Sequence, residues 1–281
     1  MRKRVRSFFL FFLLCAGLWA CATVAAGPAP GPELTGEWRQ GGVIIGKAEP
    51  GSTASFNGRA LRVSAEGMFV VGLDRDEPRK ALLVVARPGV ATFRREFDVA
   101  VREYDIQRLD GLPQDKVTPP PAAQARIARD YQQVRAARAR DSARDDFARG
   151  FIWPIVGRIS GVFGSQRILN GQPRQPHYGV DVAVPRGTPV RAPASGVVSL
   201  AVPDMYFTGG TLMIDHGHGL ASTLMHLDKV LVKEGDEVKQ GQIVAESGMT
   251  GRATGPHLDW RVSWFDSRVD AQLLAGPMPE E

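Results

Sequence analysis

Short apolar runs separated by turn-forming residues dominate residues 38–104. Five runs recur at intervals of roughly ten residues, the spacing typical of an immunoglobulin-like sandwich. Asn57-Gly58 predicts a two-residue hairpin turn, and Pro50-Gly51 marks a further turn. We therefore expect a β-sandwich domain with its linkers over residues 27–118, in which the Gly- and Pro-rich segment 27–37 is a linker. The expected strands are 42–45, 60–63, 68–71, 81–86 and 93–101.

The next segment changes to a helical pattern rich in Ala and Arg. Pro119-Pro120-Pro121 interrupts the chain, and residues 122–149 contain nine Ala and seven Arg. We expect one helix over 122–149 within a connector at 119–150, with Thr118 as a candidate cap. The connector is either solvent-facing with a narrow packed stripe, or it presents an Arg-rich face to an anionic envelope polymer. The apolar positions at helical spacing are Ile127, Tyr131 and Val134.

Every histidine of the chain falls in the last segment, residues 151–275, where short β-like runs return. This concentration of imidazoles indicates chemistry there, because histidine is the common ligand and proton carrier near neutral pH. We expect a compact antiparallel β domain followed by a tail at residues 276–281. Its expected strands are 196–202, 211–215, 221–227, 242–246 and 257–264. Its histidines are His177, His216, His218, His226 and His257.

The first 26 residues have the features of a secretory signal. A basic head precedes the apolar run 8–15, which is too short to span a bilayer comfortably, and small residues follow it. We expect cleavage after Ala26, or alternatively lipidation of Cys21, and in either case export to the periplasm or cell envelope. Both cysteines, Cys15 and Cys21, lie in this segment, so the mature chain has no thiol nucleophile. No later stretch of the sequence is long and apolar enough to be a transmembrane segment.

The basic balance of the chain comes mostly from that leader. The formal net charge is +5, and the leader contains no Asp or Glu. Removing its four basic residues from +5 leaves +1, which argues against a nucleic-acid partner. The four basic residues are Arg2, Lys3, Arg4 and Arg6.

The run 257–264 predicts a strand with one chemical and one apolar face. Side chains alternate between the two faces of a strand, so His257, Asp259 and Arg261 share one face. The opposite face packs into the core and carries Leu258, Trp260 and Val262.

His177 and Asp181 form a second candidate pair with H-x-x-x-D spacing. In an extended segment the even offset places both on one face, and Gly179 between them leaves room for close approach. Imidazole and carboxylate together are the ligand set of a hydrolytic zinc site with an open position.

At these residues the chain resembles the lysostaphin/LytM-type zinc metalloendopeptidases of bacterial peptidoglycan. The resemblance rests on several motifs in the same order and covers nearly all of residues 151–275, whereas the N-terminal segments lie outside it. It implies an antiparallel β metallopeptidase domain, so the chain as a whole is expected to be mainly β. The matching motifs are Val162-Phe163-Gly164, the stretches 177–181 and 185–198, His216-Gly217-His218-Gly219, His226-Leu227, and the stretches 234–243 and 254–259.

The resemblance also implies the roles of the site residues. His177 and Asp181 match the first two ligands of a Zn²⁺ ion, and His226 and His257 match two catalytic histidines that do not bind the metal. The last ligand of the family is a histidine, and Asp259 stands at that position. Either Asp259 completes the metal site or its shorter side chain does not reach.

Two functions follow from these alternatives. The first is an exported metalloendopeptidase that cleaves stem or cross-bridge peptides of peptidoglycan with a zinc-activated water. The second is a non-catalytic protein with a degenerate metal site, which binds peptidoglycan or activates an amidase. In both cases the N-terminal domain is a candidate docking surface for an envelope protein.

Overall fold

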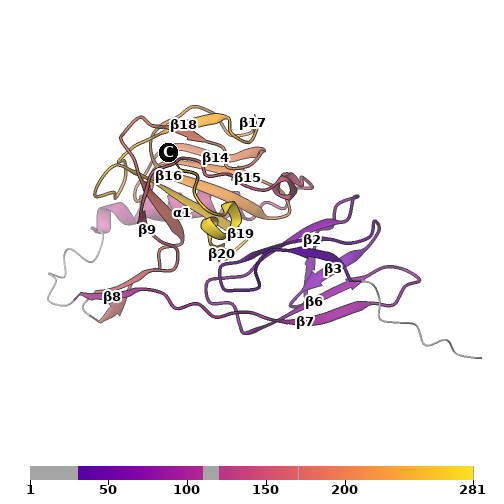
Figure 1. Cartoon of the computed structure of the whole chain (residues 1–281). Coiled ribbons are helices and arrows are strands. Elements are labelled where there is room, and N and C mark those ends of the chain that lie inside the picture. The colour runs from indigo at the N-terminus through magenta and orange to yellow at the C-terminus, as the bar shows by residue number, and fades with distance from the viewer. Residues whose placement is uncertain (1–30, 110–119, 170, 281) are drawn as a thin grey trace, which may run out of the picture.

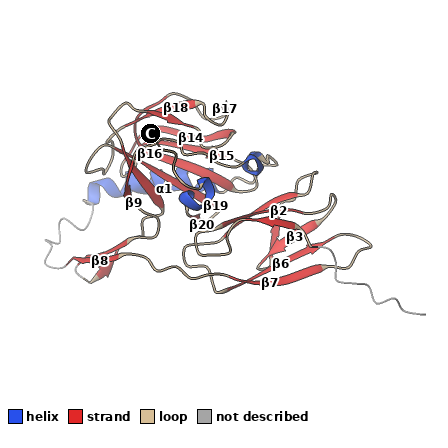
Figure 2. Cartoon of the chain, in the orientation of Figure 1, coloured by secondary structure: helices blue, strands red, loops and turns tan. Residues whose placement is uncertain are grey.

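The computed structural model describes residues 31–109, 120–169 and 171–280, and in these the chain is mainly β (Figures 1 and 2). Two β-rich bodies lie side by side and a helix crosses one side of the second body. The expected signal segment, its Cys21 and the candidate cap Thr118 lie outside the described residues. Within those residues no helix is long and apolar enough to cross a membrane.

The first body contains seven strands in two antiparallel sheets, the arrangement that a sandwich requires. The Asn57-Gly58 hairpin is confirmed, with φ of 46° and 82° and Phe56 paired with Arg59. One sheet has the order β1(Glu33–Thr35)-β2(Val43–Lys47)-β5(Met68–Gly72). The other has the order β4(Arg59–Leu61)-β3(Thr53–Phe56)-β6(Lys80–Ala86)-β7(Phe93–Asp98).

Two details of this body differ from the expectation. Strand β1 lies inside the segment expected to be a linker, because its backbone pairs with β2 despite the surrounding Gly and Pro. Strand β3 was not predicted, since its four residues Thr-Ala-Ser-Phe carry a weak apolar signal. Phe56 at its end is nonetheless 4% exposed and packs in the core.

The single helix expected over 122–149 is wrong beyond Arg138. A 3₁₀ turn, Pro121–Ala123, leads into α1(Gln124–Arg138), and a second 3₁₀ turn spans Asp146–Arg149. The residues between leave the helix because their polar groups find partners elsewhere. The Asp141 carboxylate accepts from Arg62, and the Arg144 guanidinium pairs with Glu237.

Helix α1 packs through a narrow apolar stripe, but the prediction that Tyr131 belongs to this stripe is wrong. Val134 and Ala137 pack against the apolar residues Leu200, Met205 and Met213 of the second body, whereas Tyr131 is 62% exposed. The helix therefore rests on the sheet through a few apolar contacts, with Arg129 and Arg135 exposed and Arg126 and Arg138 half-buried.

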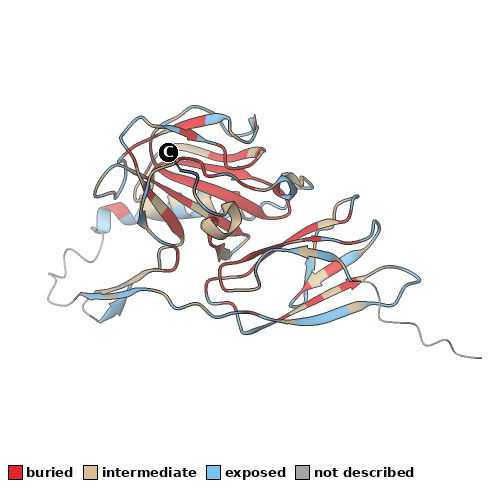
Figure 3. Cartoon of the chain, viewed as in Figure 1, coloured by how far each residue is buried: buried red, intermediate tan, exposed pale blue. Residues whose placement is uncertain are grey.

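The second body is built on a long antiparallel sheet that carries the candidate site residues. Its order is β17(Glu237–Val238)-β14(Gly196–Met205)-β15(Gly209–Asp215)-β16(Leu220–Val230)-β19(His257–Trp264)-β12(Gly179–Ala183)-β9(Arg158–Gly161). Strands β13(Pro189–Arg191), β18(Ile243–Ser247) and β20(Ser267–Val269) pair alongside it. Figure 3 shows that the central strands are buried over most of their length.

The two bodies share one core. A continuous cluster of buried apolar side chains runs from Phe69 and Leu83 of the sandwich to Trp260 and Trp264 of the sheet. At the junction the rings of Phe56 and Trp264 meet edge to face at 6.3 Å. A small sheet, β11(Gln172–Pro173)-β10(Gln166–Leu169)-β8(Ile106–Leu109), and the short helix α2(Ala271–Ala275) complete the fold.

Candidate metal centre

The alternation predicted for residues 257–264 is confirmed by β19. Leu258, Trp260 and Val262 are fully buried in the core beneath the sheet. Strand β12 runs antiparallel beside β19, and Asp181 lies directly opposite Asp259 in the register. Two carboxylates from neighbouring strands therefore lie on the same face of the sheet, because residues directly opposite in an antiparallel pair point the same way.

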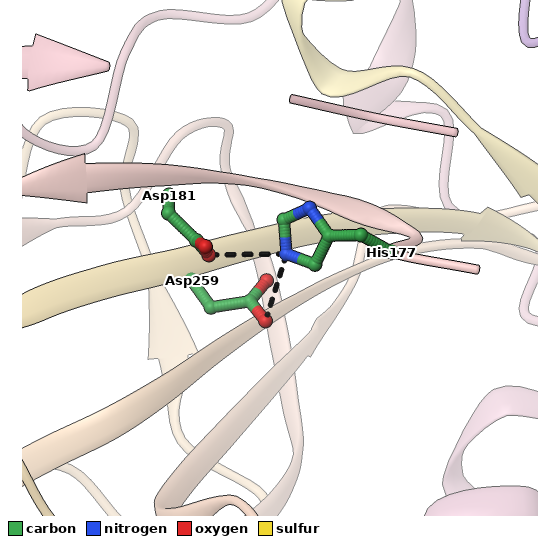
Figure 4. A group of neighbouring side chains, drawn as sticks. All are labelled: His177, Asp181 and Asp259. Carbon is green, nitrogen blue, oxygen red and sulfur yellow. Dashed lines mark ion pairs between the residues drawn. The ribbon is translucent and has the colours of Figure 1, made fainter. Parts of the chain in front are cut away.

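His177 joins these two carboxylates from the segment that precedes β12. One ligand atom of each residue lies within 4.8 Å of the others, and Figure 4 shows the three side chains converging. His177 Nε2 lies 3.1 Å from Asp181 Oδ1 and 3.4 Å from Asp259 Oδ2. Among the described residues this is the one group of three His, Cys, Asp or Glu side chains that could hold a metal ion.

The tautomer of His177 shows what this group is suited to bind. Its Nδ1 lies 3.1 Å from the carbonyl oxygen of Val162, so Nδ1–H donates there and Nε2 faces the two carboxylates. Nε2 and Asp181 Oδ1 are both buried and have no hydrogen-bond partner. A ring nitrogen and two carboxylates that face one another need a positive charge between them, either a proton on Nε2 or a cation, and the nitrogen and oxygen donors suit Zn²⁺.

The raised pKa of His177 also shows that the two carboxylates favour a positive charge at this position. Burial lowers this pKa, but the Asp181 and Asp259 carboxylates outweigh it and raise it to about 10. A proton and a metal ion would compete for one position, as they do at ordinary imidazole ligands.

Asp259 reaches the cluster in spite of its short side chain. It is 2% exposed, and its carboxylate accepts hydrogen bonds from Arg261 Nε at 3.1 Å and from Arg261 Nη2 at 2.6 Å. Burial raises the pKa of Asp259, but Arg261 and His177 lower it further, so the carboxylate is ionised. The positive charge of Arg261 offsets the negative charge of Asp259. The three candidate ligands together with Arg261 therefore carry the same net charge as one carboxylate and two neutral imidazoles.

His226 and His257 lie beside the cluster. Their ring centroids are 4.7 Å apart, and His257 Nε2 is 3.9 Å from Asp181 Oδ1. Each Nδ1 donates to a backbone carbonyl at 2.8 Å, that of Thr250 for His226 and that of Gly255 for His257. Burial lowers the pKa of His226, which keeps that ring neutral and leaves its Nε2 as an acceptor.

The remaining two histidines lie outside this group. His216 is fully buried, with its ring nitrogens 2.7 Å from the Ser195 carbonyl and 2.9 Å from Ser222 Oγ. His218 is buried against Phe147, with the two rings 5.0 Å apart. Both therefore support the packing around the 216–219 turn.

Comparison with known proteins agrees with this geometry. The model of peptidase family M23 matches residues 175–271, which include all five candidate site residues. The structure of a putative M23 peptidase from Pseudomonas aeruginosa is 31% identical, with a TM-score of 0.65, and the match covers 85% of this chain and 96% of that one. The chain belongs to peptidase family M23. The resemblance seen in the sequence is thereby confirmed.

Characterised M23 relatives match the chain over the same region. The peptidoglycan DD-endopeptidase ShyA of Vibrio cholerae is 42% identical over 142 residues, 49% of this chain and 33% of the relative. The DD-carboxypeptidase/endopeptidase Mpg of Neisseria meningitidis serogroup B (strain MC58) is 36% identical over 130 residues, 46% of this chain and 30% of the relative. The chain thus matches about a third of the length of these M23 proteins.

Sequence reasoning missed the groups that hold the M23 site in place. The carbonyls of Val162, Thr250 and Gly255 orient the three imidazoles, and a backbone carbonyl leaves no signature in residue type. The sequence indicated the hydrogen bond from Arg261 to Asp259 only weakly, through the spacing that places both residues on one face of the strand.

Gly179 is expected to be indispensable to the M23 site. A Cβ at this position would collide with Asp259 Oδ1 and lie 2.6 Å from Arg261 Cγ and 2.7 Å from the Trp260 carbonyl oxygen. Gly179→Ala should therefore displace the carboxylate, weaken metal binding and cost about 1–3 kcal/mol of stability. Metal titration and thermal unfolding measure the two effects. Gly255→Ala is the matched control, since its Cβ meets nothing within 4 Å, and equal metal affinity in the two variants would contradict the prediction.

Proposed function

We propose that the protein is a zinc metalloendopeptidase that cleaves stem or cross-bridge peptide bonds of peptidoglycan. The observation that carries the proposal is the convergence of His177, Asp181 and Asp259 beside His226 and His257. Membership of peptidase family M23 supports a peptidase activity, and the names of the relatives support peptidoglycan as the substrate.

Each residue has a role that its environment supports. His177, Asp181 and Asp259 would hold the ion, which when bound supplies a Lewis acid for the peptide carbonyl and the attacking water. Because Nδ1 of His226 and Nδ1 of His257 each donate to a backbone carbonyl, Nε2 is the atom available for proton transfer in both rings. One Nε2 would accept the proton of the water and the other, once protonated, would donate to the developing oxyanion.

We place this activity in the cell envelope. The proposed substrate lies outside the cytoplasm, and the first 26 residues carry a basic head and an apolar run typical of an export signal. Lipidation at Cys21 stays an alternative to cleavage after Ala26.

A second candidate is a binding protein or amidase activator without catalytic activity. It is favoured by a single feature, the Asp259–Arg261 ion pair at the position where the family has a histidine ligand. This candidate requires that Asp259 contributes nothing to metal binding.

Digestion of purified peptidoglycan tests the proposed activity. The full chain should release muropeptides with new amino termini, and a chelator should stop the release. A protein that sediments with peptidoglycan and leaves every peptide bond intact, even when Zn²⁺ is supplied, would support the binding candidate instead.

Replacing Asp259 distinguishes the two candidates directly. Asp259→Asn keeps the shape of the side chain and removes its charge, so a ligand role predicts a loss of metal affinity. The loss should equal or exceed the roughly 10–100-fold typical for an outer partner of a ligand. Calorimetric titration with Zn²⁺ measures it, and unchanged affinity would show that Asp259 is not a ligand.

A further inference from the structure

His177 is held by a turn, residues 162–165, rather than by a strand. Its Nδ1 donates to the Val162 carbonyl, its backbone N–H donates to the Ser165 carbonyl at 2.7 Å, and its carbonyl accepts from the Gly164 N–H at 2.7 Å. Three hydrogen bonds thus fix both the backbone and the ring of this residue. Any movement of the turn therefore moves His177 Nε2 relative to the two carboxylates on the sheet.

The N-terminal sandwich makes hydrogen bonds to the same turn from the other side. Arg75, in the loop between β5 and β6, donates from Nε at 3.1 Å and from Nη2 at 2.8 Å to the Gly164 carbonyl. Its side chain is 8% exposed, so these bonds are shielded from water. They join residues that are 89 positions apart in the sequence and belong to different bodies of the fold.

Tyr104 contacts both Arg75 and the turn. Its hydroxyl donates to the Arg75 carbonyl at 3.0 Å, and the Arg75 guanidinium lies 4.2 Å from the centre of its ring. Gly164 has a φ of 86°, and a Cβ there would collide with the Tyr104 ring. Only glycine fits a position with this backbone and this neighbour.

We propose that the N-terminal β-sandwich is a working part of the metal centre, and that Arg75 is a positioning residue that aims His177 through the turn 162–165. This role rests on the proposed metal site. It gives the sandwich a role beyond the docking surface expected from the sequence, because Arg75 of the sandwich supplies two of the hydrogen bonds that fix the turn.

The test compares two arginines that link the sandwich to the rest of the chain. Arg75→Met keeps the apolar stem and removes every N–H donor, and Arg75→Lys restores a single donor to Gly164. Arg62→Met is the matched control, since Arg62 binds Asp141 at 2.8 Å and makes no contact with the turn in the described residues. The full-length variants are titrated with Co²⁺ and Zn²⁺, and hydrogen exchange of the His177 amide is followed in the metal-free protein.

We expect Arg75→Met to weaken metal binding roughly 10–100-fold, as loss of an outer partner typically does, and to speed exchange at His177. Arg75→Lys should recover part of the affinity, and Arg62→Met should leave both readouts unchanged. Wild-type affinity and exchange in Arg75→Met would overturn the proposal, as would equal losses in Arg62→Met. If the unmodified protein binds no metal, the proposed function fails, whereas the exchange rates still decide the role of Arg75.

Discussion

Loss of the His177 imidazole should abolish metal binding and, with it, all peptidase activity. The His177→Ala variant retains two carboxylates that face each other with no nitrogen ligand between them. His177 supplies the one nitrogen ligand of the cluster, and its Nε2 lies 3.1 Å from Asp181 Oδ1 and 3.4 Å from Asp259 Oδ2. We therefore expect no stoichiometric Zn²⁺ in this variant and no release of muropeptides. Elemental analysis and a peptidoglycan digest check the two outcomes.

A second buried histidine supplies the control for this variant. His218 is buried outside the cluster with a φ of 50°, a backbone conformation that asparagine tolerates. His218→Asn should keep the metal and the activity. If His177→Ala still held one Zn²⁺ per chain, the assignment of the ligand would be wrong.

Replacing either catalytic candidate should remove activity and leave the metal in place. His226 and His257 lie outside the group formed by His177, Asp181 and Asp259, and each ring is oriented by its own backbone carbonyl. His226→Asn is preferred to alanine, because His226 has a φ of 62°. Since proton transfer by a positioned side chain typically contributes about 10²–10⁴-fold, kcat should fall by that factor in each variant.

The contrast between kcat and metal content is what identifies the role of these histidines. A structural role would lower the melting temperature and the metal content together, and a role in ground-state binding would raise KM with kcat unchanged. Steady-state kinetics on a soluble stem peptide, with metal content measured on the same preparation, separates these cases. A variant that loses its metal along with its activity would show that the histidine is a ligand.

The strand that carries His257 and Asp259 could be predicted from the sequence because both of its faces follow the same alternation. In β19 the apolar residues of one face and the polar residues of the other both alternate, and the expected range 257–264 agrees with the strand His257–Trp264. The pair His177 and Asp181 was found by its spacing, although only Asp181 lies on a strand, since β12 begins at Gly179.

What the sequence could not give depends on contacts between distant segments. The connector helix stops at Arg138 because Asp141 and Arg144 have partners in other elements, while its local composition favours helix throughout. The contact by which Arg75 supports His177 could not be predicted from the sequence either, because Arg75 binds the backbone carbonyl of Gly164 and residue type does not reveal such a bond.

Zinc titration of the metal-free full chain is the most direct test of a divalent cation between His177, Asp181 and Asp259. Zinc titrated into the unmodified protein should bind at one ion per chain, and the tight site should disappear in Asp181→Asn, whose side chain keeps its shape but loses its charge. An unmodified chain that binds no zinc, or a variant that binds it as tightly as the unmodified chain, would contradict the account.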